Sequence, residues 1–192
     1  NLESGEYPAK VTYNGRFGSD SKEVNINVSK TIESNDIVKM FRNATQYYAK
    51  FIDTSGNPLA NRAVTFNING VFYTRDTDDS GYAKLNINLR PGTYILTAYN
   101  PVNNEKKGFN ITVKALICEN HDIVKYYKNS TQYTAKVYDK DGSLAVGKTV
   151  TFNINGVFYI CQSDDNGLAT LNINLMPGKY IITAIEPVTG LD

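Results

Sequence analysis

The chain has 192 residues, with 20 Lys and Arg against 19 Asp and Glu and a formal net charge of +1. This balance gives no electrostatic reason to expect nucleic acid or an anionic membrane surface as a partner. No apolar run approaches the roughly 18–20 residues of a membrane span, so we expect no membrane insertion within this sequence. The single His and two Cys leave little of the chemistry on which enzymes near neutral pH depend.

A long internal repeat dominates the sequence. Residues 36–104 match residues 122–190 without a gap, with roughly 39 of 69 positions identical. The segment Val64–Tyr73 recurs letter for letter as Val150–Tyr159. Stalks, spacers and surface arrays repeat a folding unit in this way, because each unit only has to fold and pass the chain along. Residues 36–104 are called the first repeat below, and residues 122–190 the second repeat.

In chain order, residues 1–29 look like the last two strands of a preceding repeat. Gly5-Glu-Tyr7 parallels Gly92-Thr-Tyr94, and the alternating segment 24–28 parallels 109–113. We therefore expect a β-hairpin over residues 1–29. Pro8 falls inside its first strand, where a central strand would lose a ladder hydrogen bond.

Each full repeat alternates apolar and polar residues at the spacing of β-strands. Residues 65–69 and 85–89 place Phe, Ile and Leu on one face and Asn67, Asn86 and Asn88 on the other. The dipeptide Asn69-Gly70 predicts a two-residue hairpin turn, because both turn positions need φ > 0. We expect about seven short strands per repeat and an all-β fold of tandem sandwiches. The expected core positions are Phe66, Ile68, Leu85, Ile87, Leu89, Tyr94, Phe152, Ile154, Leu171, Ile173, Leu175 and Tyr180.

We expect three segments: a hairpin over 1–29, one repeat domain over 30–113 and a second over 114–192 that lacks its last strand. Neither end is then complete, because an isolated hairpin exposes its apolar face and the second domain presents an unpaired strand edge. Either this sequence is part of a longer polypeptide, or the hairpin of one molecule pairs with the open sheet of another. In the second case Val24, Ile26 and Val28 are the expected strand donors, joining molecules head to tail into a filament.

The combined motifs resemble a known family of surface repeats. Asp-Ile-Val-Lys followed by Thr-Gln-Tyr, Thr-Phe-Asn-Ile-Asn-Gly, Asp-Asp-x-Gly and Pro-Gly-x-Tyr-Ile-x-Thr-Ala are similar to the Ig-like repeats of adhesin-like surface proteins from methanogenic archaea, relatives of the bacterial Ig-like domains of invasin and intimin. The resemblance covers essentially the whole chain. It implies an extracellular Ig-like β-sandwich repeat in a large cell-surface protein, and it supplies neither a ligand nor a catalytic residue.

We expect the two cysteines to form a disulfide. Cys118 and Cys161 replace Ile32 and Arg75 of the first repeat, so both are private to the second. The strand that follows Cys118 begins at the pole where the strand carrying Cys161 ends, which would let the thiols approach. A bridge closing a loop of about 40 residues would contribute on the order of 3–4 kcal/mol.

Other modifications have candidate positions. Sequons occur at Asn27, Asn43, Asn110 and Asn129, and Asn43 and Asn129 are equivalent in the two repeats. A self-formed Lys–Asn isopeptide bond would draw on Lys39 or Lys125 and on Asn110.

Metal and histidine chemistry have weak candidates. Asp76, Asp78 and Asp79 loosely mimic the start of a calcium loop, but Ile87 stands where a bidentate Glu is needed, so a tight Asp-capped turn is the favoured interpretation. His121 is expected in a solvated loop. We predict no catalytic residue, no metal site and no cofactor.

The leading hypothesis is a structural and adhesive repeat region of an extracellular surface protein, whose partners are neighbouring repeats and a host or microbial surface ligand. The alternative is a specific carbohydrate- or protein-binding module that uses exposed tyrosines such as Tyr47 and Tyr133.

Overall fold

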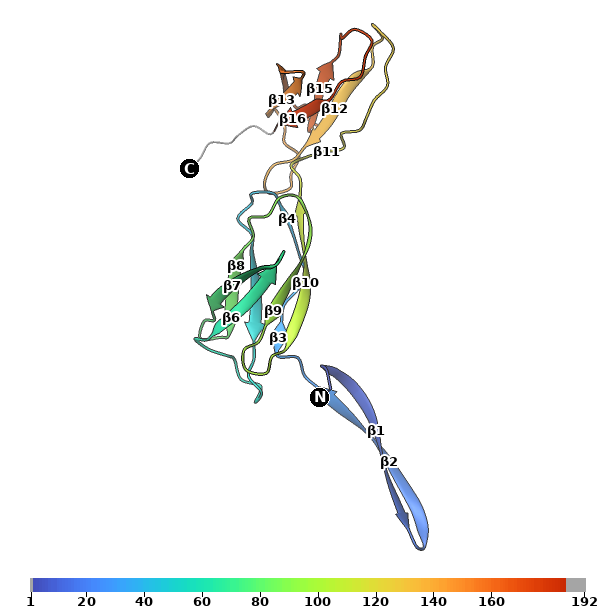
Figure 1. Ribbon diagram of the computed structural model, residues 1–192, viewed down its shortest axis with the longest axis vertical. Helices are drawn as coiled ribbons and strands as arrows, with labels where there is room; N and C mark the ends of the chain where they lie inside the picture. The colour runs from blue at the N-terminus through green and yellow to red at the C-terminus, as the bar shows by residue number, and fades with distance from the viewer. Residues whose placement is uncertain (1, 186–192) are drawn as a thin grey trace. The chain divides into compact units, whose positions relative to one another are not determined.

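The computed structural model describes residues 2–185 (Figure 1), and all regular structure in that range is β-strand. The described part of the chain therefore offers no helix that could cross a membrane. The chain divides into two compact units. One comprises the residues up to 36, 46–85 and 94–110, and the other comprises 37–45, 86–93 and the residues from 111 onward. The expected domain boundaries after residues 29 and 113 stay predictions.

The N-terminal segment is a long antiparallel hairpin of β1 (Gly5–Gly15) and β2 (Gly18–Val28). The two strands form a sheet of their own, with Gly5 opposite Val28 and Gly15 opposite Gly18. Pro8 lies inside β1 opposite Asn25. Proline is tolerated there because a strand of a two-stranded sheet has a free edge.

The first repeat and its flanks supply two sheets. A five-stranded sheet has the order β4-β10-β9-β6-β7, and a three-stranded sheet has the order β3-β5-β8. The strands are β3 (Ile32–Glu33), β4 (Ile37–Met40), β5 (Gln46–Phe51), β6 (Ala63–Ile68), β7 (Val71–Asp76), β8 (Tyr82–Asn86), β9 (Gly92–Tyr99) and β10 (Lys106–Lys114).

The second repeat forms two three-stranded sheets, of order β11-β12-β15 and β14-β13-β16. Its strands are β11 (Ile117–Cys118), β12 (Gln132–Val137), β13 (Thr149–Ile154), β14 (Val157–Gln162), β15 (Leu168–Asn172) and β16 (Ile182–Ile185). The parallel pairing of β4 with β10 has no counterpart among the described residues of this repeat.

The predicted alternation is confirmed. Asn86 and Asn88 are exposed and Asn67 is half-buried. Of the predicted core positions, the buried ones are Phe66, Ile68, Leu85, Ile87, Phe152, Ile154 and Leu171, and the half-buried ones are Leu89, Tyr94, Ile173, Leu175 and Tyr180. The fold is thus all-β, and its strands bury one face as the sequence predicted.

The Asn-Gly turns also form as predicted. Asn69 and Gly70 have φ of 52° and 77°, and Asn155 and Gly156 have φ of 51° and 84°. Both φ values are positive, as a two-residue hairpin turn of this type requires. Each turn fixes the register of its hairpin, so that Ile68 faces Val71 across the loop.

Candidate functional site

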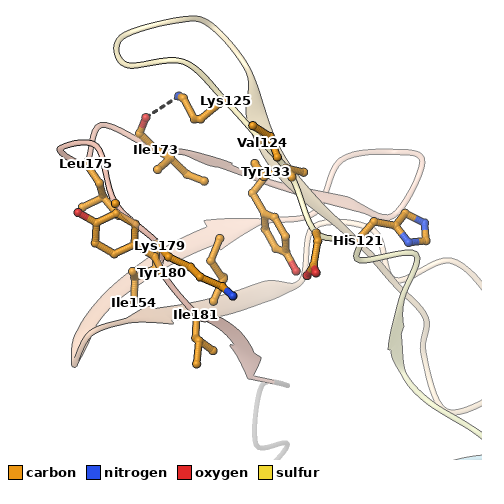
Figure 2. Close-up of a pocket in the computed structure, with 14 residues that line it drawn as sticks. His121, Val124, Lys125, Tyr133, Ile154, Ile173, Leu175, Lys179, Tyr180 and Ile181 are labelled. Atoms are coloured by element: carbon orange, nitrogen blue, oxygen red, sulfur yellow. Dashed lines mark hydrogen bonds between the residues drawn. The ribbon is translucent and has the colours of Figure 1, made fainter.

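The second repeat contains an open groove of about 630 Å³ (Figure 2). One wall is the segment 121–125, which is not in a strand, and the other is 178–182, which leads into β16. The floor is apolar. Figure 2 shows Tyr133, Ile154 and Ile173 between the two walls. Polar side chains line the rim of this floor: His121, Asp122, Lys125 and Lys179.

The equivalent place in the first repeat is occupied by a strand. There the segment equivalent to 123–126 is β4, which pairs in parallel with β10, and Ile111 lies opposite Ile37. Ile111 and Val113 of β10 are 0% and 3% exposed. The groove therefore corresponds to the space that β10, from the residues that follow the first repeat, fills beside β4.

A lysine marks this place in both repeats. The Lys39 ammonium donates to the backbone carbonyls of Asn43, Thr45 and Ile87 at 2.8, 3.1 and 2.8 Å. Lys39 is buried, and burial lowers the pKa of its ammonium below the ordinary value. The side chain ties β4 to the two segments that follow it, so it defines one wall of the strand slot.

Lys125 makes the equivalent three hydrogen bonds in the second repeat. Its ammonium donates to the carbonyls of Asn129, Thr131 and Ile173 at 3.2, 3.0 and 2.6 Å. The bond to Ile173 is drawn in Figure 2. Lys125 is only half-buried, whereas Lys39, whose strand pairs with β10, is 4% exposed. The exposure of this lysine thus differs between a filled and an open slot.

The hairpin β1–β2 carries an apolar face with no covering layer among the described residues. Val24 and Ile26 are 40% and 46% exposed, and Val28 is half-buried. Tyr7 and Ala9 lie opposite Ile26 and Val24 on the same face of the ladder. The other face of β2 carries Asn25 and Asn27, which gives β2 one apolar and one polar side.

A tyrosine hydrogen bond is shared by β1 and by the segment that leads into β16. The Tyr7 hydroxyl donates to the Glu3 carbonyl at 2.9 Å, and the Tyr180 hydroxyl donates to the Met176 carbonyl at 2.9 Å. A tyrosine that bonds a backbone carbonyl a few residues upstream marks the start of the sixth strand in many Ig-like sandwiches. The shared bond indicates that β1 is the same type of strand as β16, which is equivalent to β9. Because β2 follows β1 as β10 follows β9, β2 corresponds to β10.

The expected disulfide is not present, since Cys118 and Cys161 are free. Cys118 lies on β11 and Cys161 on β14. One sheet has the order β11-β12-β15, and the bridge between Ser163 and Ala169 connects β15 to the end of β14. Two strands, β12 and β15, therefore lie between the two cysteines. At roughly 4.8 Å per strand step, the cysteines are on the order of 10 Å or more apart, beyond the ~7 Å limit between Cα atoms. The prediction placed them at the same pole of the sandwich and ignored their lateral separation.

The tyrosines expected as exposed contacts are buried. Tyr47 and Tyr133 are 0% and 7% exposed and pack edge-on against Phe66 and Phe152, at 5.8 and 5.7 Å between ring centroids. The prediction was wrong because in both repeats this tyrosine occupies a core-facing position of the second strand. Burial also raises the pKa of the Tyr47 hydroxyl above its ordinary value.

Of the aspartates considered for calcium, Asp78 acts as a turn cap, and so does its equivalent Asp164. The Asp78 carboxylate accepts from the backbone N–H groups of Ser80 and Tyr82, both at 2.9 Å. Asp164 accepts from Asn166 and Leu168 at the same distances. Among residues 2–185 there is no group of three or more His, Cys, Asp or Glu side chains placed to hold a metal ion.

The modification candidates stay predictions. Asn129 and Asn43 lie in the expected loop, and the Oδ1 of each accepts from the backbone two residues on. Asn27 is exposed on β2, and the Asn110 side chain on β10 donates to Asp36 at 2.9 Å. Because Asn110 bonds Asp36, and the Lys39 ammonium bonds backbone carbonyls, the structure does not bring together the groups of an isopeptide bond.

Two aromatic side chains that sequence reasoning missed lie on the outer face of the first repeat. Phe72 is 64% exposed, and its ring centroid lies 6.0 Å from that of Tyr99. The Lys106 ammonium lies 5.4 Å from the centroid of Tyr99. The signal was available, since Phe72 alternates with the half-buried Tyr73 beside the Asn-Gly turn.

Comparison with protein families and with curated proteins gives no match. Among solved structures, the chain is similar to a Ca²⁺-stabilised, ice-binding adhesin of an Antarctic bacterium, at 17% identity and a TM-score of 0.30. That alignment covers 93% of this chain and 55% of the adhesin chain, so this chain spans about half of that protein's length.

Two further similarities are of the same order. Fibronectin(III)-like modules of Clostridium thermocellum CbhA align at 17% identity and a TM-score of 0.30, covering 80% of this chain and 83% of theirs. Chicken CNTN1 FN1–FN3 domains align at 10% identity and 0.27, covering 95% and 76%. These TM-scores lie well below 0.5, and the strand topology of this chain itself is what shows the β-sandwich architecture.

Proposed function

We propose that this chain is a structural and adhesive repeat region of a large extracellular cell-surface protein, of the kind found in adhesin-like proteins of methanogenic archaea. The observation that carries the proposal is the repeat: residues 36–104 and 122–190 share roughly 39 of 69 positions. Core positions are kept between them, as in the fully buried Phe66 and Phe152. Repetition that preserves the fold without gathering reactive side chains suits a spacer that projects a binding end.

Localisation tests this proposal. Antibodies raised against the chain should label intact source cells, and external protease should remove the signal. Labelling that appears only after the cells are permeabilised would contradict a surface role. An unrelated cytosolic protein, probed in parallel, controls for cell integrity.

A second candidate function is carbohydrate or protein binding through the group formed by Phe72, Tyr99 and Lys106. Aromatic rings with an adjacent polar group offer large contact area at a small entropic cost, which suits glycan and protein recognition. The equivalent outer face of the second repeat keeps Phe158 but has Ile185 in place of Tyr99.

A glycan array probed with the whole chain tests the second candidate. If this group binds, Phe72→Ala should abolish the signal and the matched Phe158→Ala should leave it unchanged. Equal loss in both variants, or no binding by the unaltered chain, would contradict the second candidate and leave the spacer role as the proposed function.

A further inference from the structure

The outer face of the five-stranded sheet has a bare strip on β10. The strip is centred on Gly108, which is exposed. Gly108 lies on the outer face because the next residue, Phe109, is buried, and successive side chains of a strand point to opposite faces. A Cβ atom at Gly108 would contact only the Ile95 side chain, at 3.5 Å, so the space above the backbone is open. A glycine inside a strand often marks a place where a ligand approaches the backbone closely.

A row of side chains leads across the same face toward this strip. Asn67 on β6 lies opposite Phe72 on β7 and opposite Thr97 on β9. Directly opposite residues share one face of a sheet, so these three side chains form a row across it. Asn67 and Thr97 are half-buried, and β10 is the next strand after β9. The row therefore places an amide and a hydroxyl between the exposed Phe72 ring and the strand that carries Gly108.

Lys106 gives the β10 side of this face a positive charge. The residue is exposed, and its ammonium lies 5.4 Å from the ring centroid of Tyr99. Among residues 2–185 no carboxylate lies within ion-pair distance of it, since the ion pairs found there involve Lys136 and Lys148. The acidic residue of β7, Asp76, is three strand steps away, or roughly 14 Å. An ammonium without a counter-charge favours a ligand that carries a negative charge.

We propose that this face of the sheet binds an anionic polysaccharide, with sugar rings on Phe72 and Tyr99 and a carboxylate or sulfate held by Lys106. The apolar C–H face of a sugar ring packs against an aromatic ring, while the hydroxyls at its edge can bond polar side chains of the row. Phe72 and Lys106 lie on strands three steps apart, or roughly 14 Å, so the ligand is longer than one sugar ring. The bare strip at Gly108 lets it lie close to the sheet.

A sugar chain suits this face better than a peptide does. The strands β6 and β9 lie inside the sheet, each with a paired strand on both sides, so the face offers no free backbone edge for an added strand. This inference rests on the second candidate function and specifies its ligand. The second repeat keeps Phe158 but has Ile185 in place of Tyr99, so its sheet supplies an internal comparison.

Calorimetric binding of the full chain to four polymers tests the chemistry of the ligand. Polygalacturonate carries carboxylates, its methyl ester is the same sugar without charge, dextran sulfate carries sulfates, and polyglutamate carries carboxylates without sugar. At least one anionic polysaccharide should bind tenfold or more tightly than the methyl ester and than polyglutamate, and the tighter of the two identifies the preferred anion. Equal affinity for the methyl ester or for polyglutamate would overturn the proposal, as would no binding to either anionic polysaccharide.

Three variants test whether this face is the site. Gly108→Gln covers the strip and should lower the affinity at least tenfold. It should keep the thermal midpoint, because the φ of Gly108 is outside the left-handed region and its Cβ has room. Lys106→Gln should also lower the affinity at least tenfold. Lys114→Gln removes the same charge from an exposed position at the end of the same strand and should change the affinity less than twofold.

Two results with these variants would overturn the site. Equal losses for Lys106→Gln and Lys114→Gln would indicate attraction by net charge alone. Full binding by Gly108→Gln would show that the ligand does not lie on the strip.

The glycan array used for the second candidate function separates the failure of the two proposals. Array binding that is confined to neutral glycans and lost in Phe72→Ala would support the candidate function and overturn the anionic ligand. A silent array together with no polymer binding would overturn both. Binding to an anionic polysaccharide that is lost in Lys106→Gln but kept in Phe72→Ala would overturn stacking on the aromatic rings.

Discussion

Lys39 and Lys125 make a paired prediction, because each donates to three equivalent carbonyls and only Lys39 is buried. Replacing Lys39 by Met keeps the aliphatic stem and removes all three hydrogen bonds. The carbonyl of Ile87 is buried and would be left without its donor, which costs about 2 kcal/mol. The carbonyls of Asn43 and Thr45 are partly buried and can recover water, at about 0.5 kcal/mol each. The expected destabilisation is about 3 kcal/mol.

Lys125→Met is the matched control. Two of its acceptors, the carbonyls of Asn129 and Thr131, are at exposed positions, and the third is partly buried. Water replaces the donor at such sites, so the expected cost is about 1 kcal/mol or less. Both substitutions remove one positive charge, so the difference between them isolates burial.

Amide hydrogen exchange measures the two effects in one molecule, strand by strand. For Lys39→Met, protection of the β4 and β10 amides should fall about a hundredfold, since 1.4 kcal/mol corresponds to a factor of ten. For Lys125→Met, protection in β12 and β15 should fall less than tenfold. Equal losses, or a loss at β10 below tenfold, would refute the account of the buried carbonyl.

Three further variants give testable predictions at Tyr47, at the two cysteines and at Asp78. Tyr47→Phe should be neutral to about 1 kcal/mol stabilising at pH 7 in urea unfolding, because the buried hydroxyl has no hydrogen-bond partner. The pKa of Tyr47 is raised in the folded state, so above about pH 10 the unfolded chain loses this proton first and the free energy of unfolding falls as pH rises. Tyr47→Phe removes this titration and should make the fall less steep. Cys118→Ser with Cys161→Ser should leave the thermal midpoint unchanged under oxidising and reducing conditions, and a drop confined to oxidising conditions would restore the disulfide. Asp78→Ala should cost about 1 kcal/mol in the same unfolding assay through loss of the turn cap, with or without added calcium, whereas a calcium-dependent difference would restore the metal site.

The strand pattern was predictable because alternation reports burial directly. Phe66 and Ile68 lie inside where the sequence placed them, and Asn69-Gly70 fixes their hairpin. Tyr47 was misplaced because a tyrosine suits both a core and an exposed contact, and composition does not choose between them. Its neighbour Tyr48 is exposed, so the parity of the strand decides which tyrosine is buried.

The groove could be foreseen only in part. The similarity of residues 24–28 to 109–113 was readable from the sequence. The apolar floor around Tyr133 and the partial exposure of Lys125 could not be predicted from the sequence. These depend on which sheet each strand joins, and hence on contacts distant in sequence.

The short strand that carries Cys118 pairs with its neighbour differently from the equivalent strand of the first repeat. In the first repeat Ile32 lies opposite Phe51, both buried, and exact correspondence would place Cys118 opposite Val137. Instead Ile117 lies opposite Val137 and Cys118 lies opposite Lys136.

This is a slip of one residue, and a one-residue slip moves every side chain to the other face of the strand. Ile117 packs against the core and Cys118 points to the side of Lys136. The slip places the larger apolar side chain, the half-buried Ile117, against the core, which stabilises the fold more than placing a thiol there would. Glu119 follows in the left-handed region at φ 54°, where the chain absorbs the change in register. A gap-free alignment shows the two substitutions that accompany the slip, Ile117 in place of Thr31 and Cys118 in place of Ile32, but it cannot show the change in pairing itself.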